Sequence, residues 1–161
     1  TSRPPKEAMA LVHIYSKAFA TREIDAMIRV THPVLILRSG GEANYRRELE
    51  VLFAQMSEAK VWPAEELLGE PSRMYVNGNT QAFSVPVLRK TAVMITPLDY
   101  VVISYDSGKS WKLIDLLCTD ERWLKAMLPG YAGVPDLLPV HPEAPKDYLS
   151  TQATSVPPLK N

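Results

Sequence analysis

Cysteine is nearly absent from this sequence of 161 residues, in which Cys118 is the only one. A single thiol excludes a disulfide within the chain and any metal site built on several cysteines. Histidine is also scarce, since His13, His32 and His141 are far apart and form no HxH or HExxH pattern. We therefore expect no metal site in this protein.

An excess of one charge sign and long apolar runs are missing as well. The 18 lysine and arginine residues equal the 18 aspartate and glutamate residues, so the formal net charge is zero. Without a basic excess there is no electrostatic reason to expect nucleic acid or an anionic membrane as a partner. No run approaches the roughly 20 apolar residues that cross a membrane, so we expect no membrane span.

Glycine-rich phosphate loops are a further absence. The adjacent pair Gly40 and Gly41 is not followed by the GK[ST] or GxxG context of a nucleotide-binding loop, and we expect no cofactor. The composition that remains, 46% hydrophobic and 22% charged, is typical of one globular domain with a real core. We assign that domain to residues 1–128 and a proline-rich C-terminal extension to 129–161.

The hydrophobic pattern predicts an α+β protein. Apolar residues recur at helical spacing in three N-terminal segments, and β-rich runs alternate with turn residues in the second half. The expected helices cover residues 6–20, 22–30 and 43–59, with a short strand over 34–38. Four longer strands over 65–76, 80–90, 92–105 and 110–117 follow, and then a short helix over 119–128.

Two features of the predicted sheet are specific. The sequence Asn77-Gly78 is a strong hairpin signal, because both residues tolerate a positive φ. Pro86 lies inside the strand over 80–90 and cannot donate to a ladder, so we expect an edge position or a bulge there.

The stretches YSKAFATREIDAMIRVTHP and DSGKSWKLIDL, together with this element order, resemble the nuclear transport factor 2-like superfamily. That superfamily includes ketosteroid isomerases, polyketide cyclases and uncharacterised bacterial members that are often exported. The resemblance implies a cone-shaped, curved antiparallel sheet packed against three N-terminal helices, with a pocket for a small apolar or amphipathic ligand. It also favours an exported or periplasmic location over a cytoplasmic one.

The same resemblance singles out Tyr15 and Asp99. Tyr15 lies where ketosteroid isomerases carry the tyrosine that hydrogen-bonds an oxyanion, and Asp99 lies where they carry an acid kept protonated by an apolar site. No general base follows the predicted strand, since that region reads ILRSGG and the nearest acid is Glu42. Arg38 can instead hold a ligand carboxylate or pair with Asp99. In the structural alternative, Tyr15 and Asp99 bond each other within a filled core.

The stretch SYDSGKSW matches the Asp-box pattern of a loop between paired strands. In this interpretation Ser104 opens the turn, Asp106 accepts backbone N–H groups, Gly108 adopts a left-handed conformation and Trp111 packs beneath. We predict a structural turn rather than a carbohydrate site. Asp115, on the last strand, is a weaker candidate for a functional site.

Two functions stay open at this point. The first is a non-catalytic module that binds a small ligand or a protein, paired as a homodimer because an apolar outer sheet face needs covering. The alternative is an isomerase-like or cyclase-like enzyme in which Tyr15 and Asp99 form an oxyanion clamp.

Overall fold

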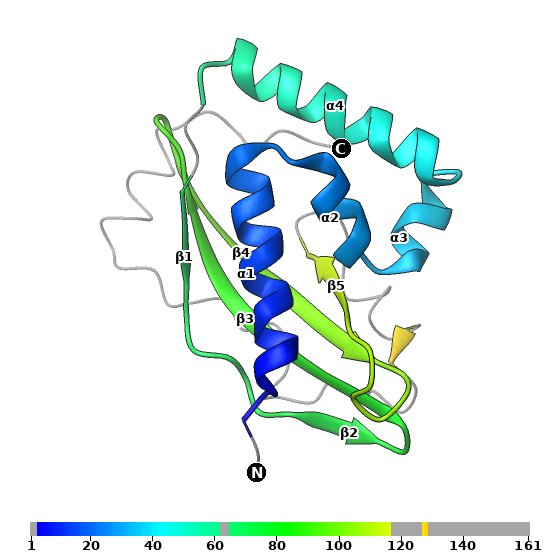
Figure 1. Cartoon of the computed structure of the whole chain (residues 1–161). Helices are drawn as coiled ribbons and strands as arrows, with labels where there is room; N and C mark the ends of the chain where they lie inside the picture. Colours follow the sequence, from blue (N-terminus) through cyan, green and yellow to red (C-terminus); the bar gives the residue numbers. More distant parts are fainter. Residues whose placement is uncertain (1–2, 62–64, 117–126, 129–161) are drawn as a thin grey trace.

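The computed structural model describes residues 3–61, 65–116 and 127–128, and within them the protein is α+β (Figure 1). Four helices come before an open sheet of five strands whose strand pairs are all antiparallel. The helices are α1 (Lys6–Thr21), α2 (Ile24–Val30), α3 (Pro33–Arg38) and α4 (Glu42–Glu58). The strands are β1 (Glu65–Leu68), β2 (Tyr75–Asn77), β3 (Thr80–Lys90), β4 (Ile95–Ser104) and β5 (Lys112–Asp115).

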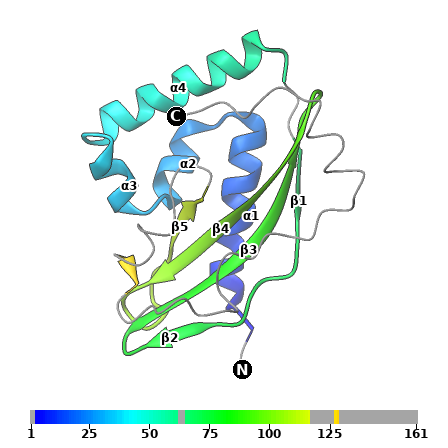
Figure 2. The same cartoon turned by 180° about the vertical axis from the view of Figure 1, so that it is seen from behind.

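Helix α1 lies across one face of the sheet, as the two opposite views in Figures 1 and 2 show. The predicted apolar stripe is the buried one, and it includes Val12, Tyr15 and Phe19. The helix ends where Arg22 takes a left-handed conformation, with φ of 59°. Helices α2 and α4 continue this layer, and α4 buries Leu49, Phe53 and Met56.

The segment over 34–38 is a helix, so the prediction of a short strand there is wrong. His32 caps this helix, since its ring nitrogen Nδ1 accepts a hydrogen bond from the N–H of Val34 at 3.1 Å. Pro33 occupies the first turn, where a missing N–H costs nothing and the fixed φ favours a helix. A five-residue apolar run does not distinguish helix from strand, and here the cap decides.

The predicted strand over 65–76 is divided into β1 and β2, which both pair with the same side of β3. Pro86 lies opposite the break. Its carbonyl accepts the N–H of Gly69 at 2.8 Å. The nitrogen and the carbonyl of a strand residue point to the same side, so the proline nitrogen, which carries no hydrogen, also faces the gap between β1 and β2, where no ladder donor is needed. Pro86 is therefore in a central strand, so the predicted edge position is wrong, and the ladder is irregular opposite it, because residues 69–74 of the partner segment face only residues 83–86. The predicted hairpin is present, but its two-residue loop is Gly78 and Asn79, one residue later than the predicted Asn77-Gly78 turn, and of these residues Gly78 alone has a positive φ.

Both faces of β4 are buried over residues 98–103. On β4, Leu98, Tyr100 and Val102 belong to the core on the α1 side. The alternate residues Val101 and Ile103 belong to a second apolar cluster on the opposite face, and both are at most 1% exposed. Part of the outer apolar face that motivated the predicted homodimer is thus covered, whereas Leu67 of β1, on the same face, is 47% exposed.

The C-terminal predictions fall largely outside the described residues. This applies to the extension over 129–161 and to most of the helix over 119–128, of which only Met127 and Leu128 are described, and both are buried. Among the described residues, no helix has the length and apolarity that crossing a bilayer requires.

Gly69 and Pro86 generate the first prediction. A Cβ atom added at Gly69 would lie 2.8 Å from Cγ of Pro86 and 3.4 Å from its carbonyl oxygen. We expect Gly69→Ala to lower the free energy of unfolding by roughly 1–3 kcal/mol, because the rigid ring cannot move aside. Urea denaturation of Gly69→Ala in the wild-type and Pro86→Ala backgrounds measures the effect. Equal losses in both backgrounds would contradict a ring clash.

Candidate functional site

The three residues predicted to form a ligand site lie in three separate places. Tyr15 is in the core between α1 and the sheet, where its hydroxyl donates to Oδ2 of Asp115 at 3.3 Å. Asp99 is fully buried, but strand alternation places it on the opposite face of the sheet, with Val101 and Ile103. Arg38 is at the exposed end of α3. The structure therefore does not bring Tyr15 and Asp99 to one cavity.

A buried network of charged and hydroxyl groups surrounds Tyr15, and at its centre is Arg89 of β3. The guanidinium donates from Nε to Oε2 of Glu66 at 2.8 Å, and from one terminal nitrogen to Oδ2 of Asp115 at 3.3 Å. The side chains of Arg89, Glu66 and Asp115 are 7%, 0% and 5% exposed. Charges this well buried are stable only when they are paired and hydrogen-bonded.

Tyr100 completes the network from β4. Its hydroxyl accepts from Arg89 at 3.1 Å and lies 2.6 and 2.5 Å from the two carboxylate oxygens of Glu66. Burial, with the nearby carboxylates, raises the pKa of Tyr100 well above its usual value, so the hydroxyl stays protonated and donates to Glu66. Burial by itself would lower the pKa of Arg89, but Tyr100, Asp115 and Glu66 hold it well above its ordinary value.

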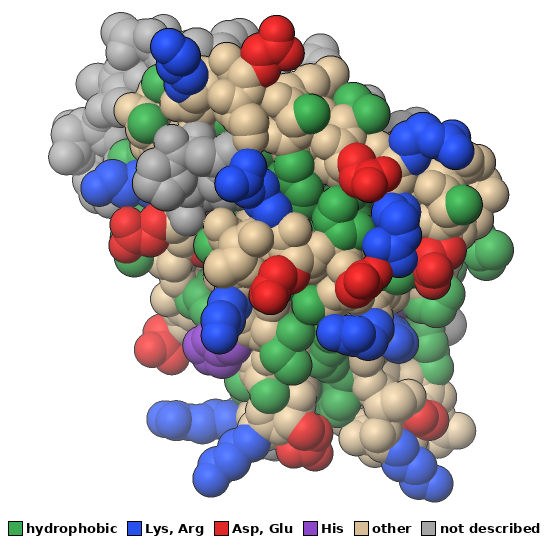
Figure 3. All heavy atoms as spheres, turned by 45° about the horizontal axis from the view of Figure 1, so that its top comes forward, with side chains coloured by type: hydrophobic (Ala, Val, Ile, Leu, Met, Phe, Trp, Pro, Cys, Tyr) green, Lys and Arg blue, Asp and Glu red, His purple; other side chains and the backbone are tan. Residues whose placement is uncertain are grey.

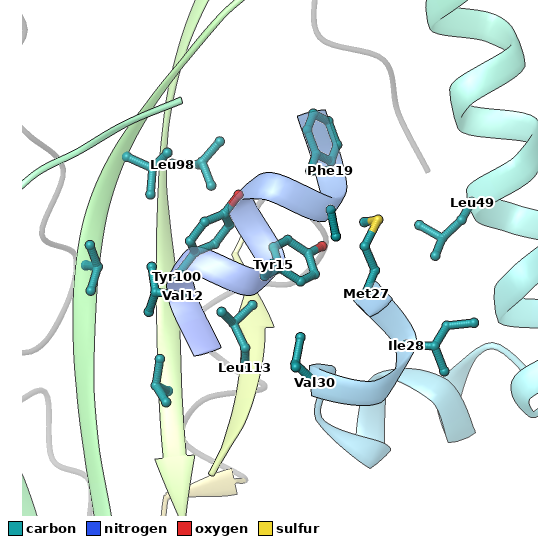
Figure 4. Close-up of a cluster of buried hydrophobic side chains, with 14 of the residues drawn as sticks. Val12, Tyr15, Phe19, Met27, Ile28, Val30, Leu49, Leu98, Tyr100 and Leu113 are labelled. Atoms are coloured by element: carbon teal, nitrogen blue, oxygen red, sulfur yellow. The ribbon is translucent and has the colours of Figure 1, made fainter. Parts of the chain in front are cut away.

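Aromatic rings enclose the network. The guanidinium carbon of Arg89 lies 3.7 Å from the ring centre of Phe19, a cation–π contact. Tyr15 and Tyr100 meet edge to face with ring centres 5.1 Å apart, and Figure 4 shows these rings side by side beneath Phe19. The side chains of the chain itself thus fill the space between α1 and the sheet.

Sequence reasoning missed Glu66, Arg89 and Tyr100 and treated Asp115 as a weak candidate. The available signal was cross-strand pairing, because Glu66 faces Arg89 directly in the β1–β3 register. That signal needs the register, which the divided strand over 65–76 concealed.

The SYDSGKSW stretch forms the loop between β4 and β5. Oδ1 of Asp106 accepts from the Ser104 hydroxyl at 2.7 Å and from the N–H groups of Lys109 and Ser110 at 3.1 and 2.9 Å. The Ser110 hydroxyl donates to Oδ2 at 2.6 Å. Hydrogen bonds from Ser110 and Ser104 lower the pKa of Asp106 to about 2.

The remaining residues of the motif hold the shape of this loop. Gly108 has φ of +87°, and a Cβ atom there would lie 3.5 Å from the Trp111 ring, so the indole packs against the loop. The carboxylate of Asp106 is therefore committed to loop contacts, which supports the structural interpretation of the motif.

His32 links three parts of the fold. Its backbone N–H donates to the carbonyl of Leu113 on β5 at 2.8 Å, and its Nε2 lies 2.8 Å from the Tyr105 hydroxyl. That hydroxyl donates to the carbonyl of Met127 at 3.0 Å. Nδ1 accepts the cap hydrogen bond from Val34, so the neutral ring donates from Nε2. Burial, together with the charge of Lys112, lowers the pKa of His32 to about 4.

A groove of about 420 Å³ runs along α4 and past the end of α3. On α4 the lining residues recur every three or four positions between Asn44 and Gln55. The lining comprises Arg38, Ser39, Asn44, Tyr45, Arg47, Glu48, Leu49, Val51, Leu52 and Gln55. Apolar and charged side chains are interspersed on the side of the molecule that carries α4 (Figure 3). Of the three residues predicted to contact a ligand, Arg38 is the one that lines this groove.

Comparisons with known proteins add little. No model of a known protein family matches the sequence, and no curated protein matches it either. Among solved structures, the chain is similar to Bd1075 of Bdellovibrio bacteriovorus, with a TM-score of 0.46 and 10% identity. The similarity covers 68% of this chain and 37% of that one, so this chain spans little more than a third of Bd1075. A likeness at this level carries no argument about function.

Because Arg89 is at the centre of the buried network, we expect its substitution to lower the free energy of unfolding strongly. We expect Arg89→Met to lower the free energy of unfolding by about 3–5 kcal/mol, because it leaves two buried carboxylates without their cation. The matched control is Arg46→Met, which removes a 2.6 Å ion pair with Asp25 whose side chains are 37% and 73% exposed. That surface pair contributes about 0–1 kcal/mol. Similar losses in the two variants, measured by urea denaturation, would contradict a stabilising role of the network.

We expect the free energy of unfolding to depend on pH through the titration of His32. The folded pKa of about 4 is below the ordinary 6.5, so the unfolded chain binds the proton more readily. This contribution is complete above pH 6.5 and is lost as the pH falls towards 4, on the order of 2 kcal/mol after solvent screening. His32→Asn keeps a capping acceptor but does not titrate. The difference between wild type and variant in denaturation midpoints should shrink over that range, and a constant difference would oppose the prediction.

Proposed function

We propose that this protein is a non-catalytic small-ligand-binding module with a nuclear transport factor 2-like architecture, and that the groove along α3 and α4 is its binding site. The groove carries the proposal, because its volume of about 420 Å³ is in the range of small-molecule pockets, about 300–1,000 Å³. Its lining combines apolar side chains such as Leu52 and Val51 with polar ones, as ligand sites do.

The architecture is proposed from the arrangement of the elements. Helices come first, α1 packs across an antiparallel sheet, and the long strands β3 and β4 form its centre. The helical segment over 33–38 departs from the expected order, in which a short strand stood at this place.

The geometry does not favour the enzyme alternative. An oxyanion clamp needs Tyr15 and Asp99 to face one cavity, but they lie on opposite faces of β4, and the Tyr15 hydroxyl bonds Asp115 among packed rings. A protein-binding module remains the less favoured form of the proposal, because the centre of the sheet face expected to form a homodimer, at Val101 and Ile103, is already buried.

A neutral, environment-sensitive dye tests the site. We expect Nile red fluorescence to increase on addition of the protein, and the increase to be lost in Val51→Trp, because the indole occupies the groove. Val51 is 49% exposed, so the substitution leaves the core intact. Titration of the dye, with circular dichroism of each variant, measures both binding and folding.

The matched control is Val76→Trp on β2, since Val76 is also exposed, at 60%, and does not line the groove. This variant should bind the dye as wild type does. Undiminished dye binding by a folded Val51→Trp protein would overturn the proposed site.

A further inference from the structure

We infer that the groove selects an elongated aliphatic carboxylate, an inference that rests on the proposed function and specifies its ligand. The first reason is that the two ends of the groove differ in chemistry. Arg38, Ser39, Asn44 and Arg47 lie at the end where α3 meets α4, whereas apolar Val51 lies further along α4. One end is therefore cationic and polar, the apolar residues Val51 and Leu52 follow further along α4, and Gln55 lies at the other end.

The cationic end is suited to a carboxylate head group. Arg47 donates from a terminal nitrogen to Oδ1 of Asn44 at 3.1 Å, which orients the guanidinium along the rim. A guanidinium carries five N–H donors in a fork that matches a carboxylate, and this bond uses one of them. Arg38 lines the same end.

The charge of the lining also favours an anion. Two arginines, Arg38 and Arg47, and one acid, Glu48, give the lining a net charge of +1. The neighbouring cation, Arg46, forms an ion pair with Asp25 at 2.6 Å and does not line the groove.

The remainder of the groove is suited to an aliphatic chain. Val51 is exposed, and the half-buried side chains of Leu52 and Tyr45 add to its apolar surface. The lining extends from Asn44 to Gln55, which corresponds to about 16 Å along the axis of α4. This is close to the extended length of a medium-chain fatty acid, so dodecanoate is a suitable probe.

Displacement of Nile red by two matched probes tests the inference, with each probe below its micelle concentration. Dodecanoate and dodecanol share a chain and differ in the head group. We expect dodecanoate to displace the dye at about tenfold lower concentration, because a charge-assisted hydrogen bond to the arginines is lost with the alcohol. Rising salt should reduce this preference, since both arginines are near solvent.

Variants assign the preference to its residues. Arg38→Gln and Arg47→Gln should each lower the affinity for dodecanoate several-fold and leave dodecanol unchanged. Arg46→Gln, one position away on the same helix, should behave as wild type.

The outcomes separate this inference from the proposed function. Equal displacement by the two probes, or displacement by neither, overturns the carboxylate assignment while dye binding that depends on Val51 keeps the groove as a site. Dye binding that is unchanged in Val51→Trp overturns the proposed function itself.

Discussion

The buried guanidinium of Arg89 is the interaction on which the rest of the fold depends. It contacts Glu66 on β1, Tyr100 on β4, Asp115 on β5 and Phe19 on α1. One side chain thus joins both flanks of the sheet to the helix above it. Because the charges are almost completely shielded from water, each partner must be in place for the others to be tolerated. This requirement fixes the register of β1, a strand of four residues that could not hold its position by packing alone.

The same network explains why the function is sought at the surface. Between α1 and the sheet, charged groups and aromatic rings of the described residues pack against one another. The groove along α4 is then the better candidate, because it is open to solvent and its lining is mixed.

Local signals in the sequence predicted local structure well. The helices over 6–20 and 43–59 and the hairpin near Gly78 follow from periodicity and turn chemistry. The prediction of a strand over 34–38 is wrong, because its apolar run suits either state and the local cap from His32 to the N–H of Val34 decides for a helix. The split strand was missed because Pro86 acts on a neighbour that is distant in sequence.

The candidate site was less predictable for the same reason. Tyr15 was correctly identified as an inward-facing tyrosine, but its partner depends on which face each strand residue takes. Asp99 and Asp115 are on adjacent antiparallel strands, and a shift of one residue exchanges the faces they occupy. The sequence of a single strand shows that alternate side chains point to opposite faces, but it does not show which set faces α1. The groove involves residues from α3 and α4, and the predicted strand over 34–38 hid that neighbourhood.

The division of β1 from β2 has a consequence for the behaviour of the protein in concentrated solution. A continuous exposed strand is a template on which another chain can add its own strand, the first step of aggregation. Within the described residues, this flank of the sheet is two short pieces of four and three residues, separated by a segment opposite a proline that offers no N–H. The opposite flank, β5, is partly occupied by Thr31 and His32. Neither flank therefore offers an incoming chain a long uninterrupted row of donors and acceptors.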